Sequence, residues 1–98
     1  MDYTFDWDSE KAHSNFKKHR VAFEEASTLF RDPLARIWYD EKHTEFEDRY
    51  LAFGYSSRQQ ALIVSFLLRE PGRIRIISAR CATRKEVRNH EKNENHES

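Results

Sequence analysis

The 98-residue chain contains little cysteine, proline or glycine: one cysteine, two prolines and two glycines. The single Cys81 excludes an internal disulfide bond and is too few thiols for a zinc cage of cysteines, so we expect it to be a small core residue. No apolar run approaches the roughly 20 residues that a membrane span needs, and the first residues lack the basic-then-apolar pattern of a signal peptide. We therefore expect a cytoplasmic protein that does not contact membranes.

The composition fits one small domain with an aromatic core. Hydrophobic residues make up 38% of the chain and charged residues 35%, so the core must depend on seven Phe, four Tyr and two Trp. A chain of this length buries only about two thirds of its unfolded surface, which leaves no room for a second core. We expect a single domain over residues 1–98, with a charged tail that frays from about residue 91. Trp38 and Tyr55 are expected in the core, with base stacking as their alternative role.

The net charge of zero hides an uneven distribution of charge. The stretch 69–88 contains seven arginines and lysines against two acids, whereas the stretch 40–48 contains five acids against Lys42. Arginine binds phosphate or carboxylate through two parallel hydrogen bonds. The basic stretch therefore predicts an anionic partner, while simple solvation of a small domain is the alternative interpretation.

Apolar periodicity and capping residues predict the secondary structure. The expected strands cover residues 3–7, 35–39, 49–55, 61–68 and 73–80, and the expected helices cover about 9–18, 23–30 and the residues after Thr83. Asp8 and Thr83 are candidate N-caps, with Glu86 as the capping-box partner of Thr83. The nearly continuous apolar run 61–68 predicts a central strand covered on both faces. The acidic segment 40–48 predicts a solvated loop or a hairpin connection. The order of elements predicts an α+β domain with a sheet that is mostly an antiparallel meander.

Six blocks of the sequence stand in a recognisable order. They are Phe5-Asp6-Trp7-Asp8 with Lys11 and Asn15, the run 18–26 (KHRVAFEEA), Asp32-Pro33, the run 49–56 (RYLAFGYS), the run 73–80 (RIRIISAR) and the run 82–86 (ATRKE). Together they resemble the BrnT toxin family, although Arg20 stands where glycine is usual and Cys81 where a basic or small polar residue is frequent. The resemblance implies a ribonuclease toxin of a type II toxin–antitoxin operon. It also implies a small RelE-like fold, an antiparallel sheet with two N-terminal helices and a C-terminal helix.

The same resemblance implies the partners of the protein. A BrnA-like antitoxin with a ribbon-helix-helix DNA-binding region would neutralise the toxin in a heterotetramer of two plus two chains and repress their shared operon. Operator DNA would be contacted through the antitoxin alone, and RNA would be the substrate. No cofactor is implied, and no metal site is expected, since the six-residue spacing of His13 and His19 places them on different sides of a helix.

RNA cleavage without a metal needs a base for the 2′-hydroxyl proton, an acid for the leaving 5′-oxygen and cations around the phosphate. Such cleavage leaves a 2′,3′-cyclic phosphate. Arg75 and Arg80 are the first candidates for the cations, because their charge is permanent. Strict alternation puts them on opposite faces of the strand, so both serve one site if a bulge intervenes or if Arg80 lies at the strand end. Ordinary salt bridges are their alternative role.

His19 is the candidate for proton transfer, because an imidazole titrates near neutral pH. Its alternative role is a hydrogen bond to the carbonyls at the end of a helix. Lys11 lies about two helical turns before His19 and would line the same face. Glu24 is a candidate base or a group that orients His19, or else a first-turn acid that interacts with the helix dipole. The remaining candidates for RNA binding are Lys18, Arg69, Arg73 and Arg84.

A binding module is the alternative to an enzyme. The same basic strand would hold RNA or an acidic antitoxin segment without cutting, and the protein would then act mainly as a corepressor in an antitoxin–DNA complex. RNA-binding and RNA-cutting surfaces use the same arginines, so the sequence does not distinguish the binding module from the enzyme. Loss of cleavage with retained RNA affinity in Arg80→Ala would favour the enzyme.

Overall fold

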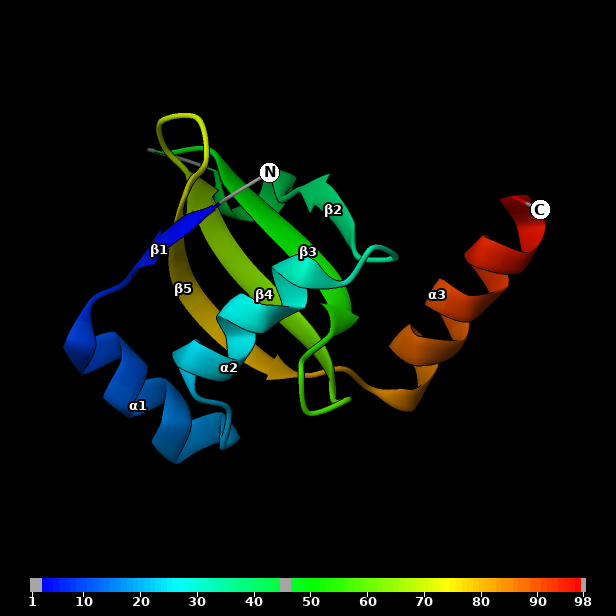
Figure 1. The fold of residues 1–98 in the computed structure, drawn as a ribbon, viewed down its shortest axis with the longest axis horizontal. Helices are drawn as coiled ribbons and strands as arrows, with labels where there is room; N and C mark the ends of the chain where they lie inside the picture. Colours follow the sequence, from blue (N-terminus) through cyan, green and yellow to red (C-terminus); the bar gives the residue numbers. More distant parts are fainter. Residues whose placement is uncertain (1–2, 45–46, 98) are drawn as a thin grey trace.

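The computed structural model describes residues 3–44 and 47–97 and has the predicted α+β architecture (Figure 1). Its elements follow the chain in the order β1 (Thr4–Asp6), α1 (Ser9–His19), α2 (Phe23–Thr28), the 3-10 turn η1 (Leu29–Arg31), β2 (Arg36–Tyr39), the 3-10 turn η2 (Glu41–His43), β3 (Arg49–Tyr55), β4 (Ala61–Leu68), β5 (Arg73–Cys81) and α3 (Arg84–Glu97). The expected strands and helices are present at the expected places. The segment 40–48, interpreted as a solvated loop or a hairpin connection, contains the turn η2 and connects the antiparallel strands β2 and β3.

The five strands form one mixed sheet with the order β1-β5-β4-β3-β2. From β2 to β5 the strands make the predicted antiparallel meander, and the apolar β4 lies at the centre of the sheet. β1 departs from a purely antiparallel sheet, because it joins the edge of β5 in parallel, with Thr4 opposite Arg73 and Asp6 opposite Arg75. A parallel pair needs a long connection between its strands, and here residues 7–72 lie between them.

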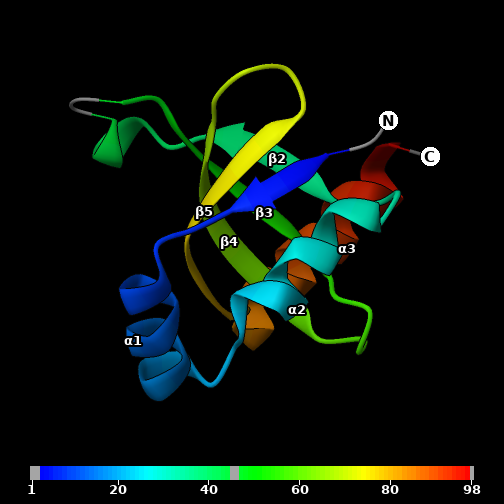
Figure 2. The ribbon, with the colours of Figure 1, turned by 60° about the vertical axis from the view of Figure 1, so that its left-hand side comes forward.

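α1 and α2 cover one face of the sheet (Figure 2). The buried residues of this core are Val21, Phe23, Ala26 and Leu29 from the helical layer, and Ala52, Leu62, Val64, Phe66, Ile74, Ile76 and Ala79 from the strands. Aromatic rings extend the core, as the composition predicted: Phe30 meets Phe66 edge to face with ring centroids 5.0 Å apart. Along β3 and β4 the core residues alternate with residues that point to the opposite face, which α1 and α2 do not cover. We call this opposite face of the sheet the open face.

α3 lies against one end of this opposite face. The ring of His90 packs on Phe53 with centroids 4.1 Å apart, and His90 is buried. The predicted capping box is confirmed, because the Thr83 amide donates to Glu86 Oε1 at 2.8 Å and the Glu86 amide donates to Thr83 Oγ1 at 3.1 Å. α3 extends from Arg84 to Glu97. Fraying from about residue 91 stays a prediction.

Cys81 is exposed, so the prediction that it is a core residue is wrong. It occupies the last position of β5, beyond the strand residues that pack beneath α1 and α2. None of the helices in the described part of the chain combines the length and the apolar composition that a membrane span requires.

The two ends of α1 differ in how well their residues suit the backbone. Asp8 is the predicted N-cap: its Oδ1 accepts hydrogen bonds from the amides of Glu10 at 2.8 Å and Lys11 at 3.2 Å. The bonds from the Lys11 and Glu10 amides lower the pKa of Asp8 below its ordinary value. At the other end Arg20 has a left-handed backbone with φ of 60°. Glycine adopts this conformation at much lower cost.

Arg20→Gly is therefore expected to stabilise the protein by about 1 kcal/mol, because it removes the clash of the Cβ atom in the left-handed region. Urea unfolding of the two proteins measures the difference. Arg20→Ala is the matched control, since it also removes the guanidinium that lies 5.8 Å from the centroid of the Phe16 ring but keeps the Cβ atom. Equal stability of the glycine and alanine variants would contradict the explanation.

Candidate active site

A β-bulge in β5 brings the candidate arginines to one face of the sheet. The register between β4 and β5 shifts by one residue, and Ile77 is the extra residue in β5. Alternation resumes beyond the bulge with the opposite phase. Arg75 and Arg80 therefore both point to the open face, while Ile76 and Ala79 point into the core. The bulge that the two arginines need in order to share one face of the sheet is therefore present.

A cavity of about 420 Å³ lies on this face, between the sheet, the turn η2, the end of α1 and the first residues of α3. Its charged and polar lining residues are His19, Asp40, Lys42, His43, Arg49, Ser65, Ser78, Arg80 and Glu86, and its apolar lining residues are Trp38, Leu51, Ile63 and Ala79. Trp38 is 44% exposed rather than buried in the core as predicted. The cavity combines two arginines, which suit a phosphate, with an aromatic ring, which suits an unpaired base.

Glu86 of α3 holds Arg80 in this cavity. Nη1 and Nη2 of Arg80 donate to Oε1 and Oε2 of Glu86, each at 2.9 Å. The same carboxylate accepts from the Thr83 amide, so the cap of α3 also orients the arginine. The hydrogen bonds from Arg80 lower the pKa of Glu86 to about 2, and the carboxylate in turn raises the pKa of Arg80. Arg80 is thus permanently charged, with an orientation that α3 determines.

The low pKa of Glu86 predicts a loss of stability in acid. Folding lowers this pKa from 4.5 to about 2, so the ion pair stabilises the fold fully above about pH 4.5 and ceases to do so as the pH falls towards 2. We expect Glu86→Gln to be less stable than the wild type by about 1 kcal/mol at neutral pH, because the partly exposed pair is screened by water. This difference should shrink over that acidic range. Urea unfolding across the range measures it, and a constant difference would contradict the explanation.

The cavity also contains an acid–histidine pair that the sequence analysis missed. Asp40 Oδ2 lies 3.0 Å from Nδ1 of His43, and Arg49 of the neighbouring strand lines the same cavity. The high acid content of the segment 40–48 indicates a solvated loop or a hairpin connection, but Asp40 is buried. The available signal was the spacing Asp-x-x-His directly after a strand, because one 3-10 turn brings residues three apart together.

Arg73 and Arg75 face the carboxylate of Asp6 rather than the cavity. Nη2 of Arg73 lies 3.1 Å from Asp6 Oδ2, and Nη1 of Arg75 lies 3.5 Å from Asp6 Oδ1. Both contacts depend on the parallel pairing of β1 with β5, which puts Asp6 beside Arg75. Arg75 thus lies on the same face of the sheet as Arg80, but at the edge where β5 pairs with β1.

His19 is the helical candidate that reaches the cavity. It is half-buried at the end of α1 and lines the cavity together with Arg80. Lys11 and Lys18 are exposed on α1, Glu24 is exposed in the first turn of α2, and none of the three lines the cavity. Arg84 is exposed at the start of α3.

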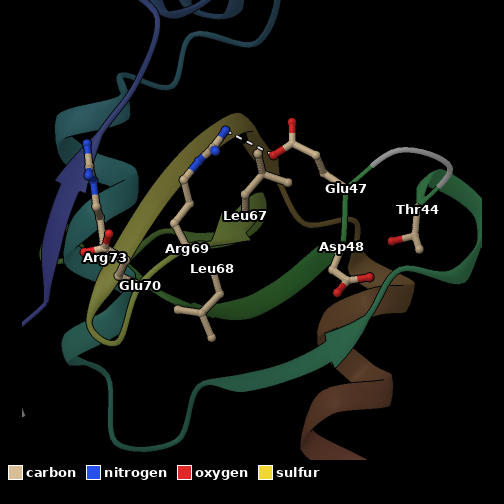
Figure 3. A pocket seen from close by; sticks show the side chains of 8 residues that line it. All are labelled: Thr44, Glu47, Asp48, Leu67, Leu68, Arg69, Glu70 and Arg73. Carbon is tan, nitrogen blue, oxygen red and sulfur yellow. Dashed lines mark ion pairs between the residues drawn. The ribbon is translucent and has the colours of Figure 1, made fainter.

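A larger cavity of about 730 Å³ lies beside the hairpin of β4 and β5 (Figure 3). Arg69 and Arg73 line it, but Glu47, Asp48 and Glu70 line it as well. Nη2 of Arg69 lies 3.1 Å from Oε2 of Glu47. The acids offset the positive charge here, so this cavity suits a phosphate less well than the one around Arg80.

The described residues contain no arrangement typical of a metal centre. Over residues 3–44 and 47–97, no group of three or more His, Cys, Asp or Glu side chains is placed to hold a metal ion. His13 is exposed on α1, whereas His19 lines the cavity.

The three helices and the five-stranded mixed sheet define a small α+β domain with a solved structural relative. The crystal structure of the ribonuclease toxin BrnT from Brucella abortus matches with a TM-score of 0.64, over 84% of this chain and 99% of that chain, at 21% sequence identity. This likeness shows the fold, and no curated protein sequence matches the chain. Residues 7–86 match the family described as ribonuclease toxin, BrnT, of type II toxin–antitoxin system. The chain belongs to this family, which confirms the resemblance of its sequence blocks.

Proposed function

We propose that this protein is the toxin of its operon and inhibits translation and growth by cutting RNA in the cytoplasm without a metal ion. The observation that carries the proposal is the bulge at Ile77. It places Arg80 in the cavity with Arg49 and His19, and Arg75 on the same face. The arginines stabilise the negative charge that builds on the phosphate during cleavage, and His19 transfers a proton. The product is a 2′,3′-cyclic phosphate.

The basic residues outside the cavity extend this surface for RNA. Arg73, Arg69, Arg84 and Lys18 contact phosphates of the strand on either side of the cleaved bond. Lys11 and Glu24 lie on the helical layer, away from the lining of the cavity, so their proposed roles depend on RNA that reaches around α1.

A type II toxin has an antitoxin partner, and we propose a BrnA-like ribbon-helix-helix protein for this one. It covers Arg75, Arg80 and Arg84 in a heterotetramer of two toxins and two antitoxins. Acidic residues of the antitoxin compete with RNA for these arginines. The assembly represses its own operon and contacts operator DNA through the antitoxin.

The experiment is an assay of end-labelled RNA with toxin freed from its co-expressed antitoxin, in EDTA. Discrete fragments that end in a cyclic phosphate are the expected result. Intact RNA from demonstrably folded toxin would contradict the proposal. If the toxin then tightened the binding of the antitoxin to operator DNA, the non-catalytic corepressor would be the better explanation.

A further inference from the structure

Asp40 and His43 form a hydrogen-bonded pair in the lining of the cavity that contains Arg80. Oδ2 of Asp40 lies 3.0 Å from Nδ1 of His43. The Asp40 side chain is 10% exposed, whereas the His43 side chain is 65% exposed. The carboxylate is therefore a buried, fixed group, and the ring remains open to an incoming ligand.

The turn that carries this pair is tied to the start of β3. The Asp40 amide donates to the Arg49 carbonyl at 2.9 Å, and the Arg49 amide donates to Oγ1 of Thr44 at 2.8 Å. Within the turn, the His43 amide donates to the Asp40 carbonyl at 3.3 Å. Hydrogen bonds on both sides of His43 thus hold the turn against the first residue of β3.

The contact with Asp40 determines which nitrogen of His43 can accept a proton. An ionised carboxylate only accepts hydrogen bonds, so Nδ1 carries the proton in this pair. The free lone pair of the neutral ring is then on Nε2, the nitrogen on the far side of the ring from Asp40. In hydrolytic enzymes with a catalytic triad, a carboxylate accepts a hydrogen bond from Nδ1 of the histidine base and keeps it in this tautomer.

The surrounding groups complete the set that RNA cleavage requires. His43 lines one cavity with Arg49 and Arg80, which can neutralise a phosphate, and with His19, a second group able to transfer a proton. The turn η2, α1, β3 and β5 thus bring two histidines and two permanent cations to one cavity of about 420 Å³.

We propose that His43 is the general base of the cleavage and that Asp40 is its positioning residue, an inference that rests on the proposed function. The 2′-oxygen of the RNA attacks phosphorus while its proton passes to Nε2 of His43. The bond between phosphorus and the 5′-oxygen breaks, and His19, protonated before the step, gives its proton to that oxygen. The products are a 2′,3′-cyclic phosphate, a 5′-hydroxyl, protonated His43 and neutral His19, and proton exchange with water restores both histidines.

His43→Asn separates this chemical role from a role in holding the turn together. The asparagine amide can keep a hydrogen bond to Asp40 from near the position of Nδ1, but it has no atom in place of Nε2. We expect the kcat of cleavage to fall about 100-fold with an unchanged melting temperature. His13→Asn, which changes an exposed histidine outside the cavity, is the matched control and should cleave as the wild type does.

Two further variants test the pair directly. His43→Ala should regain part of its activity when imidazole is added, because the free base can replace the missing ring. Asp40→Asn should lower kcat with little change in KM, and it should add little to the effect of His43→Ala, because Asp40 acts through the histidine.

The possible failures are distinguishable. If the wild type cuts RNA and His43→Asn cuts it equally fast, the role of His43 is overturned while the proposed function stands. A loss of activity in His43→Ala that imidazole does not relieve also overturns the role as base. If the folded wild type leaves RNA intact, the proposed function fails and this inference fails with it.

Discussion

Arg80→Ala is expected to slow RNA cleavage about 1000-fold while RNA affinity falls far less. The Arg80 guanidinium lies in the cavity as a permanent cation, and Glu86 fixes its orientation by accepting hydrogen bonds from Nη1 and Nη2. Negative charge on the phosphate is greater in the transition state than in the bound substrate, so removal of the cation costs more in rate than in binding. Single-turnover cleavage of end-labelled RNA measures the rate, and fluorescence anisotropy measures the affinity.

Two control variants are needed for this result, because Arg80→Ala also leaves Glu86 without its ion-pair partner. Glu86→Gln weakens the same pair but keeps the cation, and it should retain most of the cleavage activity. Arg58→Ala removes an exposed positive charge from the turn between β3 and β4 and should cleave normally. Equal losses in Arg80→Ala and Glu86→Gln, or a loss of RNA affinity as large as the loss of rate, would contradict the role of Arg80.

Asn15→Ala is expected to lower the free energy of unfolding by about 3 kcal/mol. Asn15 is 7% exposed, and its Nδ2 donates to the carbonyls of Val21 at 3.1 Å and Ala79 at 2.9 Å. Its Oδ1 accepts from the Ala79 amide at 3.1 Å. Alanine would leave these buried backbone groups without their partner, which costs roughly 1–3 kcal/mol for each group left unsatisfied. The same bonds fix α1, and with it His19, against β5.

Urea unfolding monitored by fluorescence of Trp7 and Trp38 measures this change. Ser14→Ala is the matched control, since Ser14 is the exposed neighbour of Asn15 on α1, and its effect should stay within about 0.5 kcal/mol. A loss below about 1 kcal/mol in Asn15→Ala would mean that water replaces the missing hydrogen bonds.

Elements that depend on neighbouring residues were predicted well. The Asp8 cap, the capping box of Thr83 with Glu86, and the strand 61–68 with its buried residues 62–67 each follow from residue types within a few positions. The pairing of β1 was not predicted, because alternation shows that residues 4–6 are extended but not which strand edge they join. Thr4 meets Arg73 through a contact between distant parts of the chain.

The candidate site was predicted only in part, because residue types are visible in the sequence whereas contacts between distant segments are not. Arg80 and His19 stand out by residue type, and both line the cavity. Asp40 and His43 stand in a segment whose acid content indicates solvation, and burial of the carboxylate follows from the turn packing beside β3. No glycine marks the bulge at Ile77. The sequence therefore indicated that a bulge could bring Arg75 and Arg80 to one site, but not where in β5 it lies.

By itself the sequence determined the family, the order of helices and strands, and the residue types available for chemistry, because caps, periodicity and ordered blocks are local properties. The tertiary structure decided which arginines line the cavity, which acids contact Arg73, Arg75 and Arg80, and which histidine has a carboxylate hydrogen-bonded to its ring. Strand register, the bulge in β5 and the placement of α3 set these contacts, and each results from packing between segments that are far apart in the chain.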